Sequence, residues 1–164
     1  MKNVKFAVAA LVLSLSSTAF AAQEMVWDAE YTQTQMSCGI DFANGQQTGG
    51  ILLKGEQGTD NQKAVNFVLK SNTARQSWKL TEAKLTQNTG RFAFADNLMT
   101  ISDRSQTSVF INNQEYAWSA AAQNQQIQGN SKTLAIAPKI NLDAQEMPLG
   151  TTHIQGKVVL TCEN

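Results

Sequence analysis

The sequence predicts an all-β protein, an antiparallel β-sandwich with one disulfide bond. Apolar and polar residues alternate with a period of two along most of the chain, which is typical of strands with one buried face. Turn-forming residues interrupt this alternation at the short spacing expected of a sandwich, and strands do not alternate with long helical patterns. The two cysteines, Cys38 and Cys162, lie near opposite ends of the chain.

The clearest predicted strand covers residues 150–162. One face is mostly apolar, ends in a cysteine, and would consist of Thr152, Ile154, Gly156, Val158, Leu160 and Cys162. The other face is mostly polar and would carry His153, Gln155, Lys157, Val159 and Thr161. A strand with this pattern packs one face on a core and leaves the other in solvent. We therefore expect it to close the sandwich, tied through its cysteine to the beginning of the chain.

Residues 1–21 are predicted to be a cleaved secretory signal. Lys2 and Lys5 make the start positive, residues 6–15 are apolar, and the small residues Ala19 and Ala21 stand where a signal peptidase requires them. The apolar run is too short to span a bilayer comfortably. We therefore expect an exported chain without a membrane span, in which residues 22–164 form the mature protein.

The composition of the mature chain limits its partners. Its 143 residues are enough for one domain with a substantial core. Without the two lysines of the signal it carries 11 basic and 13 acidic residues, a nearly neutral balance. Such a balance gives no electrostatic basis for binding nucleic acid or an anionic membrane, so we expect neither as a partner.

The two cysteines are expected to form an intramolecular disulfide bond, because an exported chain folds in an oxidising compartment. The bond would close a loop of roughly 124 residues, which the chain-entropy account values at on the order of 4–5 kcal/mol. Two free thiols or an intermolecular bond are the alternatives. The sequence therefore favours a link between Cys38 and Cys162.

Shorter strands are predicted along the rest of the mature chain, at residues 25–32, 36–42, 51–53, 65–70, 92–94, 98–101, 109–111, 115–118 and 134–137, with a continuation of the last one at 140–142 as the alternative. Asn44-Gly45 and Asn112-Asn113 are turn sequences, and the second can adopt the positive φ angles of a two-residue hairpin. Pro138 is expected to stop the last of these strands, because proline cannot donate a hydrogen bond to a neighbouring strand.

Residues 74–87 leave two structures open. Trp78 and Leu80 alternate as in a strand, whereas Ala83, Leu85 and the good helix formers around them would suit a short helix. We favour a strand, because the segments on both sides are strand-like.

The search for catalytic and ligand-binding chemistry finds little. The single histidine, His153, is placed on the outer face of its strand, and no cysteine or histidine cluster accompanies it. No Gly-x-Ser-x-Gly motif is present. The carboxylate pairs Asp28 with Glu30 and Asp96 with Asp103 are interpreted as a polar strand face and turn residues. We therefore expect no enzyme activity, no metal and no cofactor.

Several segments together resemble the subunits of chaperone–usher fimbriae. They are the alternating residues 25–31, the cysteine-bearing strand with Ile40 and Phe42, the strands 51–55 and 63–69, and residues 147–160, which begin with a Pro-Leu-Gly-Thr turn. Most such subunits have both cysteines near the start and an aromatic residue near the end. An early cysteine paired with one close to the C-terminus is more similar to invasin-type tip subunits of afimbrial adhesins, which shifts the expectation towards a minor or tip subunit.

The resemblance implies an immunoglobulin-like sandwich that lacks one strand. A periplasmic chaperone would fill the resulting groove, and at the outer-membrane usher the N-terminal segment of a neighbouring pilus subunit would replace it by strand addition. The donor segment of this chain would be residues 23–33, with Met25, Trp27, Ala29 and Tyr31 pointing into the neighbour's groove. The chain would pass through the periplasm to the cell surface, where a host or surface receptor would be a further partner.

This interpretation divides the chain into the signal 1–21, an N-terminal extension or donor strand 22–35, and a pilin-like sandwich 36–164. Residues 23–33 would alternatively be the first strand of a complete sandwich. The chain would then be a free-standing secreted or periplasmic binding module for a carbohydrate or protein ligand. A small secreted hydrolase is a third alternative, for which the sequence names no catalytic residues.

Overall fold

The computed structural model describes residues 29, 37–58, 62–126 and 131–163. The chain divides into two compact units, Met1–Thr32 and Gln33–Asn164. Of the first unit only Ala29 is described, as an exposed residue. The expected signal and the expected donor residues Met25, Trp27 and Tyr31 lie outside the described residues. The fold reported below is therefore that of the second unit.

The second unit is built mainly from antiparallel β-strands, which confirms the all-β prediction. Its described strands are β1 (Cys38–Phe42), β2 (Val65–Ser71), β3 (Arg75–Gln87), β4 (Thr107–Ile111), β5 (Gln114–Tyr116), β6 (Gln125–Gln126), β7 (Ser131–Ile140) and β8 (His153–Glu163). Three short helical turns accompany them: η1 (Ala43–Gly45), η2 (Leu98–Thr100) and α1 (Trp118–Ala121).

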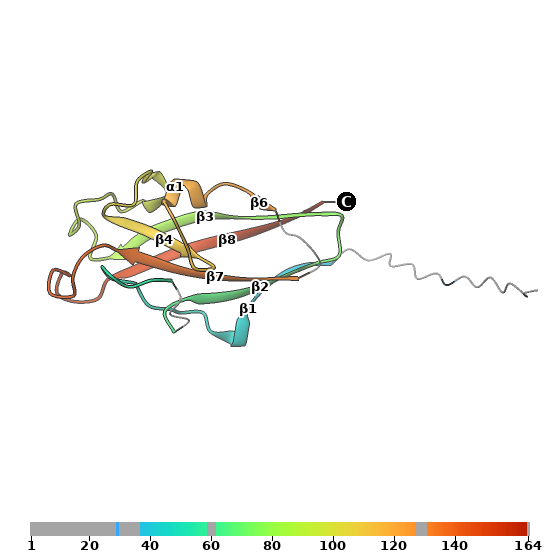
Figure 1. Ribbon diagram of the computed structural model, residues 1–164, viewed down its shortest axis with the longest axis horizontal. Coiled ribbons are helices and arrows are strands. Elements are labelled where there is room, and N and C mark those ends of the chain that lie inside the picture. The colour runs from blue at the N-terminus through green and yellow to red at the C-terminus, as the bar shows by residue number, and fades with distance from the viewer. Residues whose placement is uncertain (1–28, 30–36, 59–61, 127–130, 164) are drawn as a thin grey trace, which may run out of the picture. The chain divides into compact units, whose positions relative to one another are not determined.

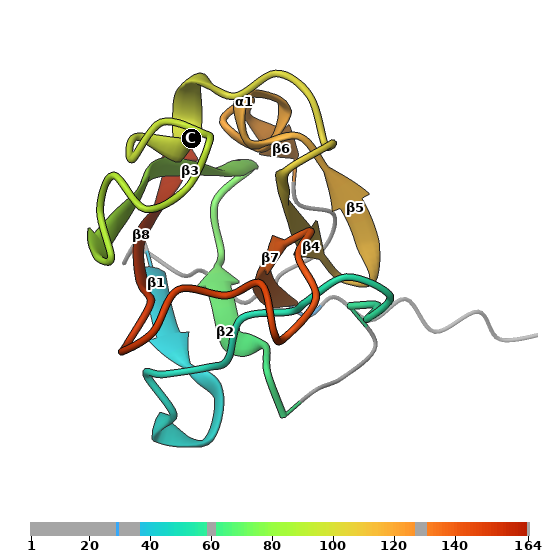
Figure 2. The same cartoon turned by 90° about the vertical axis from the view of Figure 1, so that its left-hand side faces the viewer.

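The strands form two sheets (Figures 1 and 2). The order in the five-stranded sheet is β1-β2-β7-β4-β5, and the order in the three-stranded sheet is β6-β3-β8. All neighbouring strands are antiparallel. Beyond the named strands, Leu52 pairs with Lys139 in the parallel sense, so a short extended segment lies beside the end of β7.

One core lies between the two sheets. The residues that fill it come from both sheets and from the helical turns, and include Leu69, Trp78, Leu80, Val109, Trp118, Leu134 and Ile136. Because side chains alternate along a strand, Phe110 and Ala137 point to the opposite face of the five-stranded sheet. There they form a second, smaller cluster with Leu52 and Ala64, beneath the connection between β1 and β2.

The β4–β5 hairpin forms as predicted. Asn112 and Asn113 connect its strands with φ angles of 48° and 70°. Both angles are positive, as a two-residue hairpin turn of this type requires, and asparagine tolerates them better than most residues. Residues 74–87 also form the strand that we favoured over a helix, as part of β3.

Pro138 does not stop a strand, contrary to the expectation, since β7 runs through it to Ile140. Val65, the first residue of β2, pairs with Ile136 and so ends the β2 ladder before it reaches Pro138. The Pro138 carbonyl instead accepts a hydrogen bond from the Leu52 N–H at 2.8 Å. At Pro138, β7 passes from pairing with β2 to lying beside the segment around Leu52. Because proline has no N–H, no backbone donor at this position lacks an acceptor.

Residues 92–94, predicted to be a strand, form only bends. Two further strand predictions are wrong as well. Residues 98–101 contain the turn η2, whose Leu98 is fully buried as part of the core. Trp118 begins the single-turn helix α1 and does not extend the strand that ends at Tyr116. Its indole N–H donates to Thr107 Oγ1 at 3.1 Å in the core. In both segments, burial of one large side chain determines the local structure more strongly than alternation does.

The connection over the second cluster is held by Glu56. Its carboxylate accepts hydrogen bonds from the Leu53 N–H at 2.6 Å and from Lys63 Nζ at 2.5 Å. The bond to Lys63, and after it the bond to Leu53, lower the pKa of Glu56 below its ordinary value of 4.5. This carboxylate therefore stabilises the fold in its ionised form.

Replacing Glu56 with Gln is expected to lower the free energy of unfolding by less than about 1 kcal/mol at pH 7, because the pair is partly exposed to solvent. Since the pKa is depressed in the folded state, this contribution exists above the ordinary pKa and disappears as the pH falls through the folded-state value. Urea denaturation from pH 7 to about pH 3 would measure the loss. Glu82→Gln, on an exposed position of β3, is the matched control and should show no such difference.

Candidate functional site

The two sheets each end in a strand whose outer edge has no described partner. β8 pairs with β3 from Gln87↔His153 to Arg75↔Glu163, and no other described strand pairs with it. β1 pairs only with β2 in the same way. An unpaired edge presents a row of backbone N–H and C=O groups to which a further strand can bond.

A disulfide bond joins these two edge strands at one end. Cys38, the first residue of β1, is bonded to Cys162, the second-last residue of β8, and their Cα atoms lie 6.1 Å apart. The predicted pairing of the cysteines is therefore confirmed. From this bond the two strands extend along the same side of the core, β1 towards Phe42 and β8 back towards His153.

An apolar groove of about 860 Å³ runs beside the inner faces of β8 and the five-stranded sheet. Apolar side chains of both sheets line it, among them Phe42, Val65, Phe67, Ile136, Leu80, Ile154 and Val158. Trp118 also lines it, and Met147 and Pro148 of the β7–β8 connection extend the lining. The groove is thus continuous with the core between the sheets and open to solvent.

The apolar faces of the edge strands are only partly covered. The inner face of β8 is the predicted one, because Ile154, Val158 and Leu160 pack against the core, yet none of the three is fully buried. On β1, Ile40 is 41% exposed. By contrast, all five residues of the central strand β4 are buried. The two edge strands therefore bury their apolar faces less completely than the central strand does.

The middle of the groove wall is a shallow depression, because two small residues face each other there. Gly156 of β8 pairs with Ala83 of β3, between the larger pairs Leu80↔Val158 and Leu85↔Ile154. A Cβ atom at Gly156 would lie 3.4 Å from the Glu82 carbonyl oxygen and 3.7 Å from Leu80 Cδ1, both ordinary contact distances. Gly156 therefore places no side chain of its own on this part of the groove wall.

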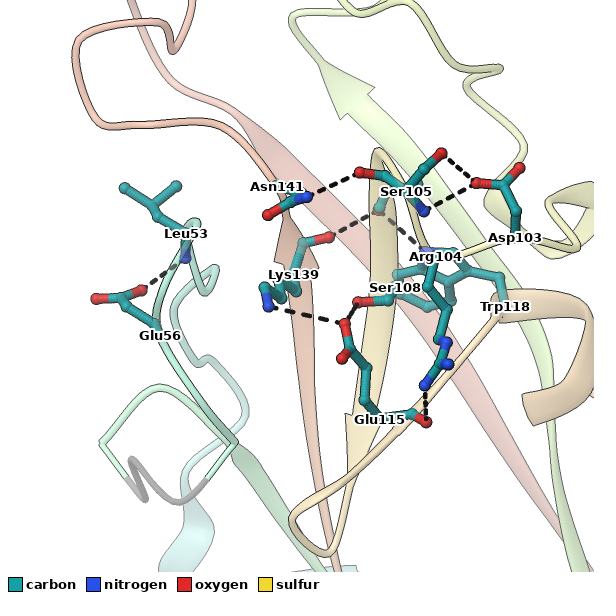
Figure 3. A network of polar contacts seen from close by, with 11 residues as sticks. Leu53, Glu56, Asp103, Arg104, Ser105, Ser108, Glu115, Trp118, Lys139 and Asn141 are labelled. Atoms are coloured by element: carbon teal, nitrogen blue, oxygen red, sulfur yellow. Dashed lines mark hydrogen bonds and ion pairs between the residues drawn. The ribbon is translucent and has the colours of Figure 1, made fainter.

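A polar network stabilises the five-stranded sheet away from the groove (Figure 3). Glu115 Oε1 accepts a hydrogen bond from Ser108 Oγ at 2.6 Å and lies 3.7 Å from Lys139 Nζ. The same ammonium group lies 5.5 Å from the centre of the Phe110 ring. Thr107 Oγ1 donates to the Lys139 carbonyl at 2.7 Å. These contacts join β4, β5 and β7 side by side.

Of the remaining residues that the sequence singled out, His153 is among those that line the groove, and the described carboxylates bond locally. His153 is exposed, and its Nδ1 lies 2.5 Å from Thr86 Oγ1. Asp96 accepts a hydrogen bond from the Gly90 N–H at 3.1 Å, and Asp103 accepts one from the Ser105 N–H at 2.9 Å. Asp28 and Glu30 lie outside the described residues. The structure therefore brings together Cys38 and Cys162, whereas Asp96 and Asp103 each bond within their own turn.

Sequence reasoning did not identify the groove residues as a site. Ile154, Val158 and Leu160 were interpreted as ordinary core residues of a closed sandwich. The available signal was Gly156, because a glycine inside a strand often marks the close approach of another backbone or ligand. Phe42 and Phe67, whose ring centres lie 5.1 Å apart at the groove wall, gave no such signal.

The described residues also limit what the groove and its surroundings can bind. Among them, no group of three or more His, Cys, Asp or Glu side chains is placed to hold a metal ion. No helix in this part of the chain is both long enough and apolar enough to cross a membrane. Comparisons with models of protein families, with curated proteins and with solved structures found no match.

Proposed function

We propose that this chain is a structural or adhesive subunit of a cell-surface fimbria, assembled by donor-strand complementation. One observation carries the proposal: an apolar groove of about 860 Å³ borders a strand edge of β8 with which no described strand pairs. Main-chain hydrogen bonds from an added strand would satisfy the edge of β8, and its alternate side chains would cover Ile154 and Val158. In this proposal the two sheets form an immunoglobulin-like sandwich that lacks one strand.

The donor would be residues 23–33 of a neighbouring subunit. Met25, Trp27, Ala29 and Tyr31 share one face of an extended segment, and three of the four are large. The apolar groove wall suits such a face, and the depression at Gly156 suits a bulky side chain such as that of Trp27. The segment's other face carries Val26, Asp28, Glu30 and Thr32, which suits exposure to solvent.

The route to the assembled state follows from the same surface. An uncovered apolar groove beside an unpaired strand edge promotes aggregation. A periplasmic chaperone would cover the groove after export, and an outer-membrane usher would exchange it for the neighbour's segment. The subunit would then pass from the periplasm to the cell surface, where a receptor would be a further partner.

A free-standing secreted or periplasmic binding module is the second candidate. A polar hollow of about 530 Å³ on the other side of the five-stranded sheet favours it. Glu115, Lys139, Gln57 and Asn113 are among its lining residues, a set of carboxylate, ammonium and amide groups that suits a carbohydrate. In this case residues 23–33 would serve their own chain and the purified protein would be a stable monomer.

The decisive experiment compares donor-face and opposite-face variants of residues 22–164. Trp27→Asp should abolish self-assembly in sedimentation velocity, because a charge would enter an apolar groove. Val26→Asp, one residue away on the opposite face, is the matched control and should assemble normally. A synthetic peptide of residues 23–33 should then raise the unfolding temperature of the Trp27→Asp chain by roughly 5–10 °C at 100 times its Kd.

The contrary result is equally clear. A wild-type chain that remains monomeric, unfolds cooperatively and shows no change in unfolding temperature with the peptide would contradict a fimbrial subunit and support the binding module.

A further inference from the structure

The β7–β8 loop surface, formed by Met147, Pro148 and Leu149, is an exposed apolar feature at one end of the strands. The Leu149 side chain is 99% exposed, whereas Met147 and Pro148 line the groove. The loop lies at the end of the sheets opposite to the C-terminus (Figure 1). It thus stands at the end of the groove next to His153.

Local hydrogen bonds fix this loop. The Glu146 N–H donates to the Asp143 carbonyl at 2.9 Å, and the Glu146 carboxylate accepts from the Asp143 N–H at 2.9 Å. Lys54 Nζ lies 3.0 Å from Asp143 Oδ2. At the far side of the leucine, Gly150 adopts a φ of 95°, which a residue with a side chain rarely adopts. Leu149 is therefore held outwards by an ordered loop.

The disulfide bond determines the end at which a bound segment leaves the groove. Neighbouring strands lie about 4.8 Å apart, so a strand inserted between β1 and β8 needs about 9.6 Å between them. At Cys38 and Cys162 the Cα atoms are only 6.1 Å apart, which leaves no space for an inserted strand. A segment attached to a folded body must therefore leave the groove at the opposite end, beside the β7–β8 loop surface.

The segment between residue 33 and β1 is short, so the folded body of the donating copy must lie close to the end where its segment leaves the groove. Five residues lead from Gln33 to Cys38, the first residue of β1. Fully extended, they span at most about 18 Å. A second copy whose residues 23–33 fill the groove would therefore begin its sheets within this distance of the groove mouth.

We propose that the β7–β8 loop surface is a contact site for the body of the second copy whose residues 23–33 occupy the groove. The inference rests on the proposed donor-strand function. Leu149 becomes buried between consecutive subunits and strengthens assembly beyond what the inserted segment supplies. The contact surface on the second copy is the end that carries its Ser37 and its disulfide bond.

The test separates the contact between bodies from the insertion of the segment. Leu149→Asp is made in residues 22–164, with Gln114→Asp on the exposed β4–β5 hairpin as the matched control. Sedimentation velocity gives the concentration at which half of the chain is assembled. Binding of a fluorescent peptide of residues 23–33, which has no body, is measured in a Trp27→Asp background that cannot donate its own segment.

Leu149→Asp should weaken self-assembly at least about tenfold, because burying a leucine side chain changes an equilibrium constant by one to two powers of ten. Its affinity for the peptide should stay within about twofold of the parent, since the peptide has no body to contact the loop. Gln114→Asp should match the parent in both measurements. Leu149→Met, which keeps an apolar side chain of similar volume, should assemble nearly as well as the parent.

Three results would overturn the inference. If Leu149→Asp reached half assembly at the same concentration as the parent, the β7–β8 loop would make no contact between the folded bodies of neighbouring copies. A loss of peptide affinity in the same variant would show that Leu149 belongs to the groove itself. Failure of the parent chain to bind the peptide would instead contradict the proposed function, and the inference would fall with it.

Discussion

Replacing both Cys38 and Cys162 with Ser is expected to lower the free energy of unfolding by about 4 kcal/mol. The bond joins residues 124 positions apart, so without it the unfolded chain gains the conformational freedom of a long loop. In the folded state the same bond connects β1 to β8, two strands with no described hydrogen-bond ladder between them. Urea denaturation of the variant and of the parent would measure the difference.

Reduced parent protein is the control for this prediction, because it lacks the bond but keeps both cysteines. It should unfold at nearly the same urea concentration as the double variant. If the variant and the parent unfolded at the same urea concentration, the packing of β1 on β2 alone would hold the end of the groove where the disulfide bond lies. Under the proposed function, loss of the disulfide bond at that end of the groove should also weaken binding of the peptide of residues 23–33.

Replacing Trp118 with Ala is expected to lower the free energy of unfolding by about 3–5 kcal/mol, which is typical of a large aromatic residue removed from a core. Trp118 is 2% exposed and packs in the core between the two sheets. Its indole N–H also donates to Thr107 Oγ1, itself fully buried. Thermal or urea unfolding of residues 22–164 would measure the loss.

Two milder variants separate packing from the hydrogen bond. Trp118→Phe keeps much of the ring volume and should cost less than Trp118→Ala. Thr107→Val keeps the shape but removes both the acceptor of the indole N–H and the donor to the Lys139 carbonyl, which should cost about 1–3 kcal/mol. A Trp118→Ala variant as stable as the parent would contradict the core position described here. Because Trp118 also lines the groove, its loss should further weaken peptide binding under the proposed function.

Local sequence patterns predicted much of the fold. The period of two identified β8 and its inner face, because alternation reports which side of a strand meets the core. Asn112-Asn113 identified the hairpin, because few residue types adopt two successive positive φ angles. The pairing of Cys38 with Cys162 followed from the expected oxidising compartment and from the absence of other cysteines. Each of these predictions needs only neighbouring residues or composition.

The sequence was less informative where the fold departs from local rules. In β3 the buried positions change from Trp78 and Leu80 to Ala83 and Leu85, because a register shift follows Leu80. The resulting spacing of three residues resembles a helix, which explains why residues 74–87 were ambiguous. The continuation of β7 through Pro138 depends on which strand lies beside it, a tertiary fact that no local pattern contains.

The groove was the hardest feature to predict. It results from how far apart two strand edges lie, and each edge separately has the pattern of an ordinary half-buried strand. Phe42 and Val158 are 116 positions apart in the sequence, and nothing near either of them indicates that their strands flank an uncovered space. The expectation of a groove came from the family resemblance, and from the residues alone a closed sandwich would have been expected.

The pairing of β3 with β8 has a consequence for the order in which the chain is made. A ribosome that adds 5–20 residues per second needs roughly 6 to 25 s to proceed from Cys38 to its bonding partner 124 positions later. From the completion of β3 at Gln87 until β8 is made, β3 has no β8 to pair with, so the three-stranded sheet cannot be completed in that part of the interval. Closure of this sheet therefore depends on the last described strand of the chain, and the body between β3 and β8 is made before the sheet can be completed.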